Sequence, residues 1–340
     1  MALTQKDLTI NKPLSPIYVL FGKQSYLIQL IKDKIINQAL TQEEKDFNLS
    51  SYNMEETPIE AAIEDAETLP FIGEKRVVVI ENPYFLTAER SKSKVEHHLK
   101  QFEKYIESPS PGTVLIVIAF YEKLDQRKKL VKLLTKASKT YELSQLTDDL
   151  LFKLLENIAL DYDAHYTKEG HEQLLALVGP HLTYLANEVK KFALYCGKDH
   201  PIDKSIVNEL GARSLENNVF SLVDMVMRKQ TANAYHLLND LLKQKEEPVR
   251  LLALISRQIR IVYQVSLFQN EGYTQKQMAA KLKLHPYAVK IASGQAKAFN
   301  RQDLERALSQ CAEADYQMKN GSMEKTLALE LLIHKLAQIK

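Results

Sequence analysis

The stretch TPIEAAIEDAETLPFIGEKRVVVI, residues 57–80, decides the fold because it joins a helix signal to a buried-strand signal. Thr57 with Glu60 three residues later is the pattern of a capping box, so a helix is predicted to start here. Apolar residues recur at helical spacing until Pro70, which disfavours helical geometry in the residue before it. The β-branched run VVVI, residues 77–80, is typical of a strand covered on both faces. The stretch therefore predicts a helix followed by an interior strand.

The turn between that helix and that strand is apolar, although turns are usually built from polar residues, glycine and proline. It consists of Leu69, Pro70, Phe71 and Ile72. In one interpretation Phe71 folds back onto the preceding helix as local core, as most turn aromatics do. In the other, the turn is a protruding apolar plug that enters a pocket on a partner protein. The residues alone leave both interpretations open.

Strand-like and helical segments alternate from residue 17 to about residue 143. Strands are predicted at 17–21, 47–52, 77–80, 114–120 and 140–143, and helices at 25–40, 57–69, 89–106 and 123–139. Repeated strand–helix alternation predicts an α/β domain with a parallel sheet and helices on both faces.

In parallel α/β sheets, nucleotides often bind at the turn after the first strand. Here that turn reads FGKQSY at residues 21–26. A P-loop needs the longer pattern GxxxxGK(S/T), because a glycine-rich arc must aim several backbone N–H groups at the phosphates. Gly22 and Lys23 are present, but the first glycine and its loop are missing, and no GxGxxG motif occurs. Glu81 and Asn82 follow the third strand in place of a paired acidic dipeptide. We therefore interpret Gly22 and Lys23 as a degenerate nucleotide loop.

Beyond residue 144 the strand signal disappears and helical periodicity continues to the end. Helices predicted at 147–161, 167–178, 181–195 and 203–210 would form a small helical domain. A second helical block begins near residue 217, with helices predicted at 219–228, 231–244, 248–270, 274–281, 286–296, 301–319 and 323–339. The length of 340 residues also predicts two or three domains.

The composition is that of a soluble globular protein, with 26% charged residues, 45% hydrophobic residues and a formal net charge of +2. The longest apolar run, residues 114–120, is far short of the roughly 20 residues that cross a bilayer. The first ten residues have no signal-peptide core. We therefore expect a cytoplasmic protein without membrane contact, in which Cys196 and Cys311 are small core residues.

The sequence contains no GxSxG, HExxH or Cys-x-x-Cys pattern, so we expect neither catalytic residues nor a metal site. His97 and His98 are predicted to be solvated on an exposed helix, because adjacent residues do not share a helix face. Basic residues gather at Lys123, Arg127, Lys128, Lys129, Lys132 and Lys136. They are predicted to form a solvated helix face, with a phosphate-binding patch as the alternative.

Residues 272–299 resemble a helix-turn-helix. A DNA-reading second helix would project Arg, Asn or Gln near its start, but Tyr287, Ala288 and Val289 occupy those places. We therefore favour a helical hairpin in a structural domain, and keep a helix-turn-helix DNA-binding regulator as the alternative function. A nucleotide-dependent ATPase ranks third.

A family resemblance is carried by the order and spacing of several segments. These are PIYVLFGKQSYLI, TLPFIGEKRVVVIEN, YEKLDQRKKLVKLL, LANEVKKFALYCG, NNVFSLVDMVMR, RQIRIVYQV and EADYQMKNG, which begin at residues 16, 68, 121, 185, 217, 257 and 313. Through them the sequence resembles, over essentially its full length, the delta-subunit family of bacterial DNA polymerase III clamp loaders.

The resemblance implies an AAA+ relative with three domains. Residues 1–143 would form a RecA-like parallel-sheet domain without a functional P-loop, residues 144–213 a small helical lid, and residues 214–340 an all-α collar for oligomerisation. It implies no intrinsic catalysis in this chain, although the chain would belong to the DNA polymerase III holoenzyme, a DNA-directed DNA polymerase and nucleotidyltransferase. No cofactor is expected, because ATP would be bound by partner subunits.

The resemblance also implies partners and a contact site. The partners would be the sliding clamp (beta), the tau/gamma and delta prime subunits of a hetero-pentamer, and primed DNA reached through that assembly. In the family, a Leu–Phe pair at the end of the helix before the third strand grips the clamp. Phe71 matches the second member, Pro70 stands at the usual Leu position, and Leu69 lies one place earlier. We expect Phe71 to be the main anchor, supported by Leu69 and Ile72.

Overall fold

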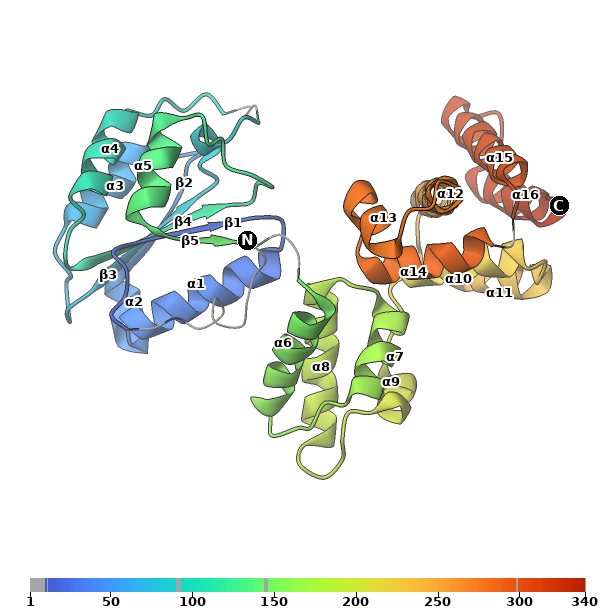
Figure 1. The fold of residues 1–340 in the computed structure, drawn as a ribbon, viewed down its shortest axis with the longest axis horizontal. Coiled ribbons are helices and arrows are strands. Elements are labelled where there is room, and N and C mark those ends of the chain that lie inside the picture. The colour runs from blue at the N-terminus through green and yellow to red at the C-terminus, as the bar shows by residue number, and fades with distance from the viewer. Residues whose placement is uncertain (1–9, 11, 90–92, 144–145, 298, 340) are drawn as a thin grey trace. The chain divides into compact units, whose positions relative to one another are not determined.

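The computed structural model describes residue 10 and residues 12–89, 93–143, 146–297 and 299–339 (Figure 1). The chain divides into two compact units, Met1–Lys153 and Leu154–Lys340. The division falls within helix α6 (Asp148–Leu160). Each unit has its own architecture.

The first unit is built on a five-stranded parallel sheet with the order β2-β3-β4-β1-β5. Its strands are β1 (Ile17–Phe21), β2 (Leu49–Asn53), β3 (Arg76–Glu81), β4 (Thr113–Ala119) and β5 (Lys139–Glu142). The runs of β3 and β4 are almost wholly buried, because continuous β-branched and aliphatic residues suit strands covered on both faces. The predicted parallel sheet is confirmed.

Helices cover both faces of this sheet (Figure 1). They are α1 (Ser25–Ala39), α2 (Gln42–Asn48), α3 (Ile59–Glu67), α4 (Leu99–Glu107) and α5 (Lys129–Ala137), with a short 3-10 turn at Tyr84–Leu86. Helices α3, α4 and α5 share one apolar core with Val78 and Ile80 of β3. Val77 and Val79 alternate with them and are also buried, on the face that α1 covers.

Several predicted boundaries differ from the structure. The strand predicted at 47–52 begins at Leu49, because Phe47 and Asn48 complete α2. The helix predicted at 89–106 begins only at Leu99; residues 90–92 lie outside the described part of the chain. The helix predicted at 123–139 begins at Lys129.

The predicted capping box at the start of α3 is wrong. Pro58 is the residue that precedes the helix, and no side chain of the usual kind caps it. The Ile59 N–H donates instead to Nδ1 of His97 at 3.1 Å, and Glu60 Oε1 accepts from the backbone N–H of His98 at 3.1 Å. The helix start is therefore capped by His97, which lies 38 residues further along the chain, and not by the nearby Thr57.

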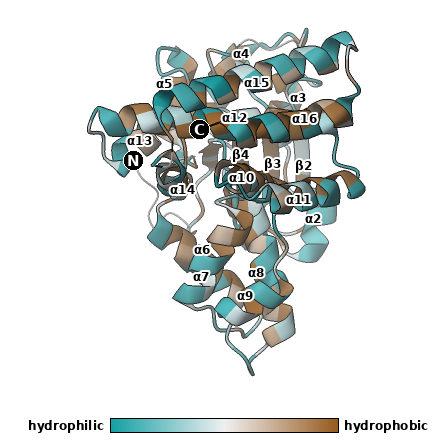
Figure 2. Ribbon diagram, turned by 90° about the vertical axis from the view of Figure 1, so that its right-hand side faces the viewer, coloured by the Kyte–Doolittle hydropathy of each residue, from teal (hydrophilic) through white to brown (hydrophobic). Residues whose placement is uncertain are grey.

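The second unit is helical. Its helices after α6 are α7 (Lys168–Val178), α8 (Leu182–Cys196), α9 (Lys204–Leu210), α10 (Leu215–Met227), α11 (Thr231–Lys243), α12 (Pro248–Asn270), α13 (Gln275–Leu282), α14 (Pro286–Ala296), α15 (Arg301–Asn320) and α16 (Lys325–Gln338). The predicted helices are present here with small shifts of their ends. One isolated parallel bridge joins Tyr166 to Ile202. In Figure 2 the helices show both hydrophilic and hydrophobic residues, as amphipathic helices do when they bury one stripe.

Helix α12 is central to the second unit. Its Leu251 and Ile255 belong to a core shared with α10, α11, α15 and α16, while Val262 and Val265 belong to a second core with α13 and α14. In the described part of the chain, α12 is the one helix long and apolar enough to span a bilayer by length and composition alone. Part of that apolar stretch is buried in these two cores.

Candidate functional site

The predicted plug residues lie on the loop at 68–75, which joins α3 to β3. Leu69 and Phe71 are 82% and 73% exposed, and Ile72 is 36% exposed. The Pro70 ring is half-buried beside Gly112. The interpretation of Phe71 as core packed on the preceding helix is therefore wrong, because its side chain projects from the unit.

The sheet register explains where this loop lies. Leu49 of β2 pairs with Val77 of β3, and Arg76 pairs with Thr113 of β4. The loop before Arg76 therefore runs between the end of α2 and the turn that precedes β4. Lys75 Nζ donates to the carbonyl of Pro111 at 2.7 Å, and the Arg76 N–H donates to the carbonyl of Gly112 at 2.9 Å. The loop is thus attached along one side to the amino-terminal edge of the sheet.

Helix α2 borders the loop on its other side. The rings of Phe47 and Phe71 are stacked, with centroids 5.3 Å apart and planes inclined by 21°. Phe47 is itself 55% exposed, so the two rings continue one apolar surface. The sequence interpretation missed the role of Phe47, because it placed this residue in the strand predicted at 47–52 and not at the end of a helix.

Asn48 fixes the loop backbone from the interior. Its side chain is wholly buried. Oδ1 accepts a hydrogen bond from the Phe71 N–H at 2.7 Å, and Nδ2 donates to the Ile72 carbonyl. Both ends of the amide are therefore satisfied by the two residues that carry the apolar side chains. No sequence signal identified this residue.

The degenerate nucleotide loop lies at the carboxyl end of β1. Gly22 has a φ of 141°, and a Cβ there would lie 2.3 Å from the carbonyl oxygen of Leu143. The Gly22 N–H donates to the Ala119 carbonyl at 3.2 Å, and the Gln24 N–H donates to the Leu143 carbonyl at 3.1 Å. Lys23 Nζ lies 3.3 Å from the Glu122 carboxylate. Two backbone donors of this turn thus bond to protein carbonyls, and the Lys pairs with a carboxylate.

The predicted exposure of the two histidines is half correct. His98 is exposed, whereas His97 packs against the rings of Tyr84 and Phe85, at centroid distances of 5.3 and 4.9 Å. Burial lowers the pKa of His97 below its usual value of 6.5. The prediction failed for His97 because this segment is not helical and its imidazole is needed as the acceptor for the Ile59 N–H.

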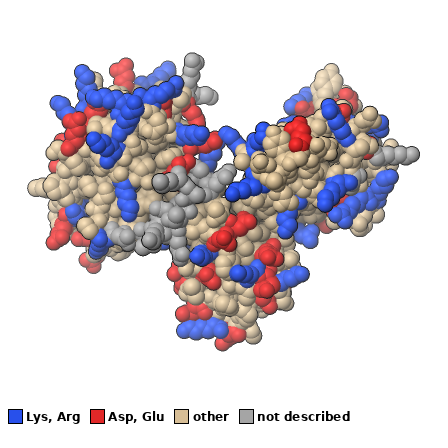
Figure 3. All heavy atoms as spheres, viewed as in Figure 1, with Lys and Arg blue, Asp and Glu red and all other residues tan. Residues whose placement is uncertain are grey.

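The basic residues at 123–136 do not share one helix face, because α5 starts only at Lys129. Lys128 Nζ turns inward and donates to the carbonyls of Phe85 and Thr87 at 2.8 and 2.7 Å. Arg127 pairs with Asp125 and holds the pKa of that carboxyl low, at about 2. Lys129 pairs with Glu103, while Lys132 and Lys136 are exposed. Figure 3 shows charges of both signs interspersed over much of the face in view.

The α13–α14 hairpin packs as a structural element. Met278 and Ala279 of α13 and Val289 and Ala292 of α14 are buried in the core that they share with Val262 of α12. This packing agrees with the favoured interpretation, and the alternative of a DNA-binding regulator receives no support.

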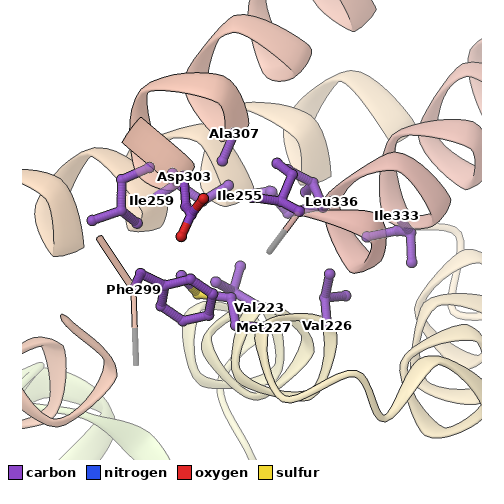
Figure 4. Close-up of a pocket in the computed structure, with 12 residues that line it drawn as sticks. Val223, Val226, Met227, Ile255, Ile259, Phe299, Asp303, Ala307, Ile333 and Leu336 are labelled. Carbon is purple, nitrogen blue, oxygen red and sulfur yellow. The ribbon is translucent and has the colours of Figure 1, made fainter. Parts of the chain in front are cut away.

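The second unit contains a small apolar hollow (Figure 4). It lies among α10, α12, α15 and α16 and is lined mainly by aliphatic residues such as Val226 and Ile333. The one carboxylate in its lining, Asp303, is already hydrogen-bonded, because it forms a reciprocal capping box with Asn300 at the start of α15. We regard the hollow as incompletely filled helix packing.

Fold and site together define a class of protein: a parallel α/β unit followed by helices, with an exposed apolar loop before its third strand. Comparison with known families is more specific. Residues 18–144 match the family model described as DNA polymerase III, delta subunit. Residues 216–336 match the model for the C-terminal domain of the same family. The chain belongs to the DNA polymerase III delta-subunit family.

A sequence comparison and a structure comparison agree with this assignment. The chain is 42% identical over 321 residues to DNA polymerase III subunit delta of Bacillus subtilis (strain 168), covering 94% of this chain and 92% of that protein. It is similar to the solved structure of the Bacillus subtilis DNA clamp loader delta protein, with a TM-score of 0.71 and 42% identity. That match covers 95% of each chain.

Proposed function

We propose that this chain is the delta subunit of a DNA polymerase III clamp loader, and that it binds and opens the sliding clamp through Leu69, Phe71 and Ile72. Membership of the delta family and the likeness to a clamp loader delta structure support the general role. The observation that carries the site is Phe71, a large apolar side chain that is 73% exposed on a loop attached at several points. Anchor residues of interfaces have this character.

In the proposed mechanism the apolar loop enters a hydrophobic pocket on the clamp and stabilises an open clamp interface, so that the clamp is loaded on primed DNA. The chain acts in a cytoplasmic hetero-pentamer with tau/gamma and delta prime subunits. Residues 1–143, 144–213 and 214–340 serve as a RecA-like AAA+-type domain, a lid and an oligomerising collar.

The partner subunits bind ATP in this proposal, and this chain performs no catalysis of its own. The turn at Gly22 supports that division of roles, because Leu143 occupies the space beside Gly22 and two backbone donors are already bonded. The corresponding test is calorimetry of the purified chain with Mg-ATP. We expect no saturable binding at micromolar concentrations, and such binding would contradict the proposal.

The decisive experiment measures binding of the purified sliding clamp to the full chain and to Phe71→Ala. We expect the variant to lose about 2 kcal/mol or more of binding free energy, which is roughly thirtyfold in Kd. Leu194→Ala is a suitable control, because Leu194 is 71% exposed on α8, far along the chain from the loop. Wild-type affinity in Phe71→Ala would show that the loop is not the anchor.

A further inference from the structure

We propose that Phe47 and Asn48, the last two residues of α2, are positioning residues that hold Phe71 in the outward orientation needed for clamp binding. This inference rests on the proposed function, and it adds residues that lie 23 and 24 positions before the anchor. Neither residue belongs to the apolar turn itself.

Asn48 determines the course of the backbone at the anchor. Its amide accepts from the Phe71 N–H and donates to the Ile72 carbonyl, and the side chain is wholly buried. If the loop backbone at Phe71 and Ile72 moved away, the buried side-chain amide of Asn48 would lose its hydrogen-bond partners. Such a loss costs free energy because water cannot replace them. The pair of bonds therefore selects one direction for the backbone at Phe71, and that direction sends the Phe71 side chain away from the core.

Phe47 restricts the Phe71 ring. In the stacked geometry, with centroids 5.3 Å apart, each ring lies with one face against the other, while both side chains remain exposed. An exposed aromatic side chain without such a neighbour would sample several rotamers, and ordering them would cost affinity on binding. Because the stack with Phe47 already restricts the Phe71 ring, Phe71 loses less conformational entropy when the clamp binds.

The end of α2 is firmly placed, so both contacts rest on a stable base. Thr41 and Glu44 form a reciprocal capping box at the start of the helix. The strand that follows α2 pairs with the strand that follows the loop, which places residue 48 beside the loop's end. Gly73, with a φ of 71°, approaches the Glu44 carboxylate so closely that a Cβ there would overlap it.

The inference predicts that changes at Phe47 and Asn48 act through Phe71. Asn48→Asp keeps the acceptor for the Phe71 N–H but replaces the donor to the Ile72 carbonyl with a second oxygen. Phe47→Ala removes the stacked ring and, at an exposed position, leaves the core intact. We expect clamp affinity to fall about fivefold to tenfold in each variant, with faster amide exchange at Phe71.

The test measures clamp binding of the full chain in a set of variants: Phe47→Ala, Asn48→Asp, Phe71→Ala, and each of the first two combined with Phe71→Ala. Hydrogen–deuterium exchange at residues 68–75 and thermal unfolding are recorded in parallel. If Phe47 acts by positioning the Phe71 ring, Phe47→Ala combined with Phe71→Ala binds no more weakly than Phe71→Ala alone. If Asn48→Asp does not fold, Phe47→Ala alone decides the question.

The outcomes are distinguishable. Wild-type binding by Phe71→Ala would overturn the proposed function, and the positioning role with it. Weak binding by Phe71→Ala together with wild-type binding by Phe47→Ala and Asn48→Asp would overturn the positioning role alone. A loss from Phe47→Ala that adds to that of Phe71→Ala would also overturn it, because it would indicate that Phe47 contacts the clamp independently.

Discussion

Asp65 on α3 and Arg76 at the start of β3 form an ion pair, with 2.6 Å between Oδ1 and Nη1, that brackets the loop carrying Phe71. Both side chains are largely buried. Close by, the Thr113 hydroxyl donates to the Ala66 carbonyl at 2.7 Å. These contacts fix the two ends of the loop, while Asn48 fixes its middle.

Asp65→Ala is expected to lower the free energy of unfolding by about 3 kcal/mol, because it leaves the Arg76 guanidinium without its counter-ion in a largely buried place. Urea denaturation of both proteins measures the change. Asp315→Ala is the matched control, since the Asp315–Lys319 pair is exposed and such pairs contribute at most about 1 kcal/mol. Equal effects of the two substitutions would contradict the structural role of the Asp65–Arg76 pair.

Leu69→Ala is expected to separate binding from stability. Leu69 is the most exposed of the loop's apolar side chains, so its truncation should change the free energy of unfolding by less than about 0.5 kcal/mol. If it is buried by the clamp, affinity should fall by about 1 to 2 kcal/mol. Titration of the clamp against both proteins checks the second value. A loss of stability as large as the loss of affinity would place Leu69 in the fold rather than in the interface.

His97 is expected to make stability depend on pH. Burial lowers its folded-state pKa, so the unfolded chain binds a proton at higher pH than the folded protein. The contribution of neutral His97 is fully present above about pH 6.5 and declines as pH falls through that value toward the lower folded-state pKa. Because the ring is only partly buried, the slope should be a fraction of the roughly 1.4 kcal/mol per pH unit of a fully linked proton.

Urea denaturation at a series of pH values between 5 and 8 tests the role of His97. In His97→Gln the slope below about pH 6.5 should become shallower, because the variant has no imidazole to protonate next to the Ile59 N–H. His200→Gln provides the control, since His200 is exposed in the second unit. An unchanged pH profile in His97→Gln would refute this assignment.

Gly22→Ala and Gly294→Ala are expected to change stability in opposite directions. A Cβ at residue 22 would lie 2.3 Å from the Leu143 oxygen, and the φ of 141° disfavours any side chain, so a loss above about 2 kcal/mol is expected. Gly294 is exposed within α14 and a Cβ there meets nothing within 4 Å. Alanine should therefore stabilise by about 0.5 to 1 kcal/mol. Thermal unfolding of the two variants gives both signs.

The parts of the fold that follow from local patterns were predictable. The uninterrupted run at residues 77–80 indicated an interior parallel strand, and Pro70 with the apolar residues around it indicated an unusual turn. The helices of the second unit followed from their periodicity. Each of these signals lies within a window of a few residues, which is the range over which helix and strand periodicity operate.

The parts that were missed depend on contacts between distant segments. Asn48 reaches a loop 23 residues later, and His97 caps a helix that starts 38 residues earlier. Sequence spacing cannot place such partners, because their meeting depends on the strand register. The capping box expected from Thr57 and Glu60 failed for the same reason, since the Glu60 carboxylate accepts a hydrogen bond from the distant His98 N–H instead.

The parallel sheet separates two surfaces of the first unit. The Gly22 turn follows the carboxyl end of β1, whereas the loop with Phe71 precedes the amino end of β3, so the two stand at opposite rims of the same sheet. Strands of this length span about 17 Å. Residues at one of these two ends of the sheet can therefore change without altering the structure of the other end. A partner contact at the amino end does not require a working nucleotide site at the carboxyl end.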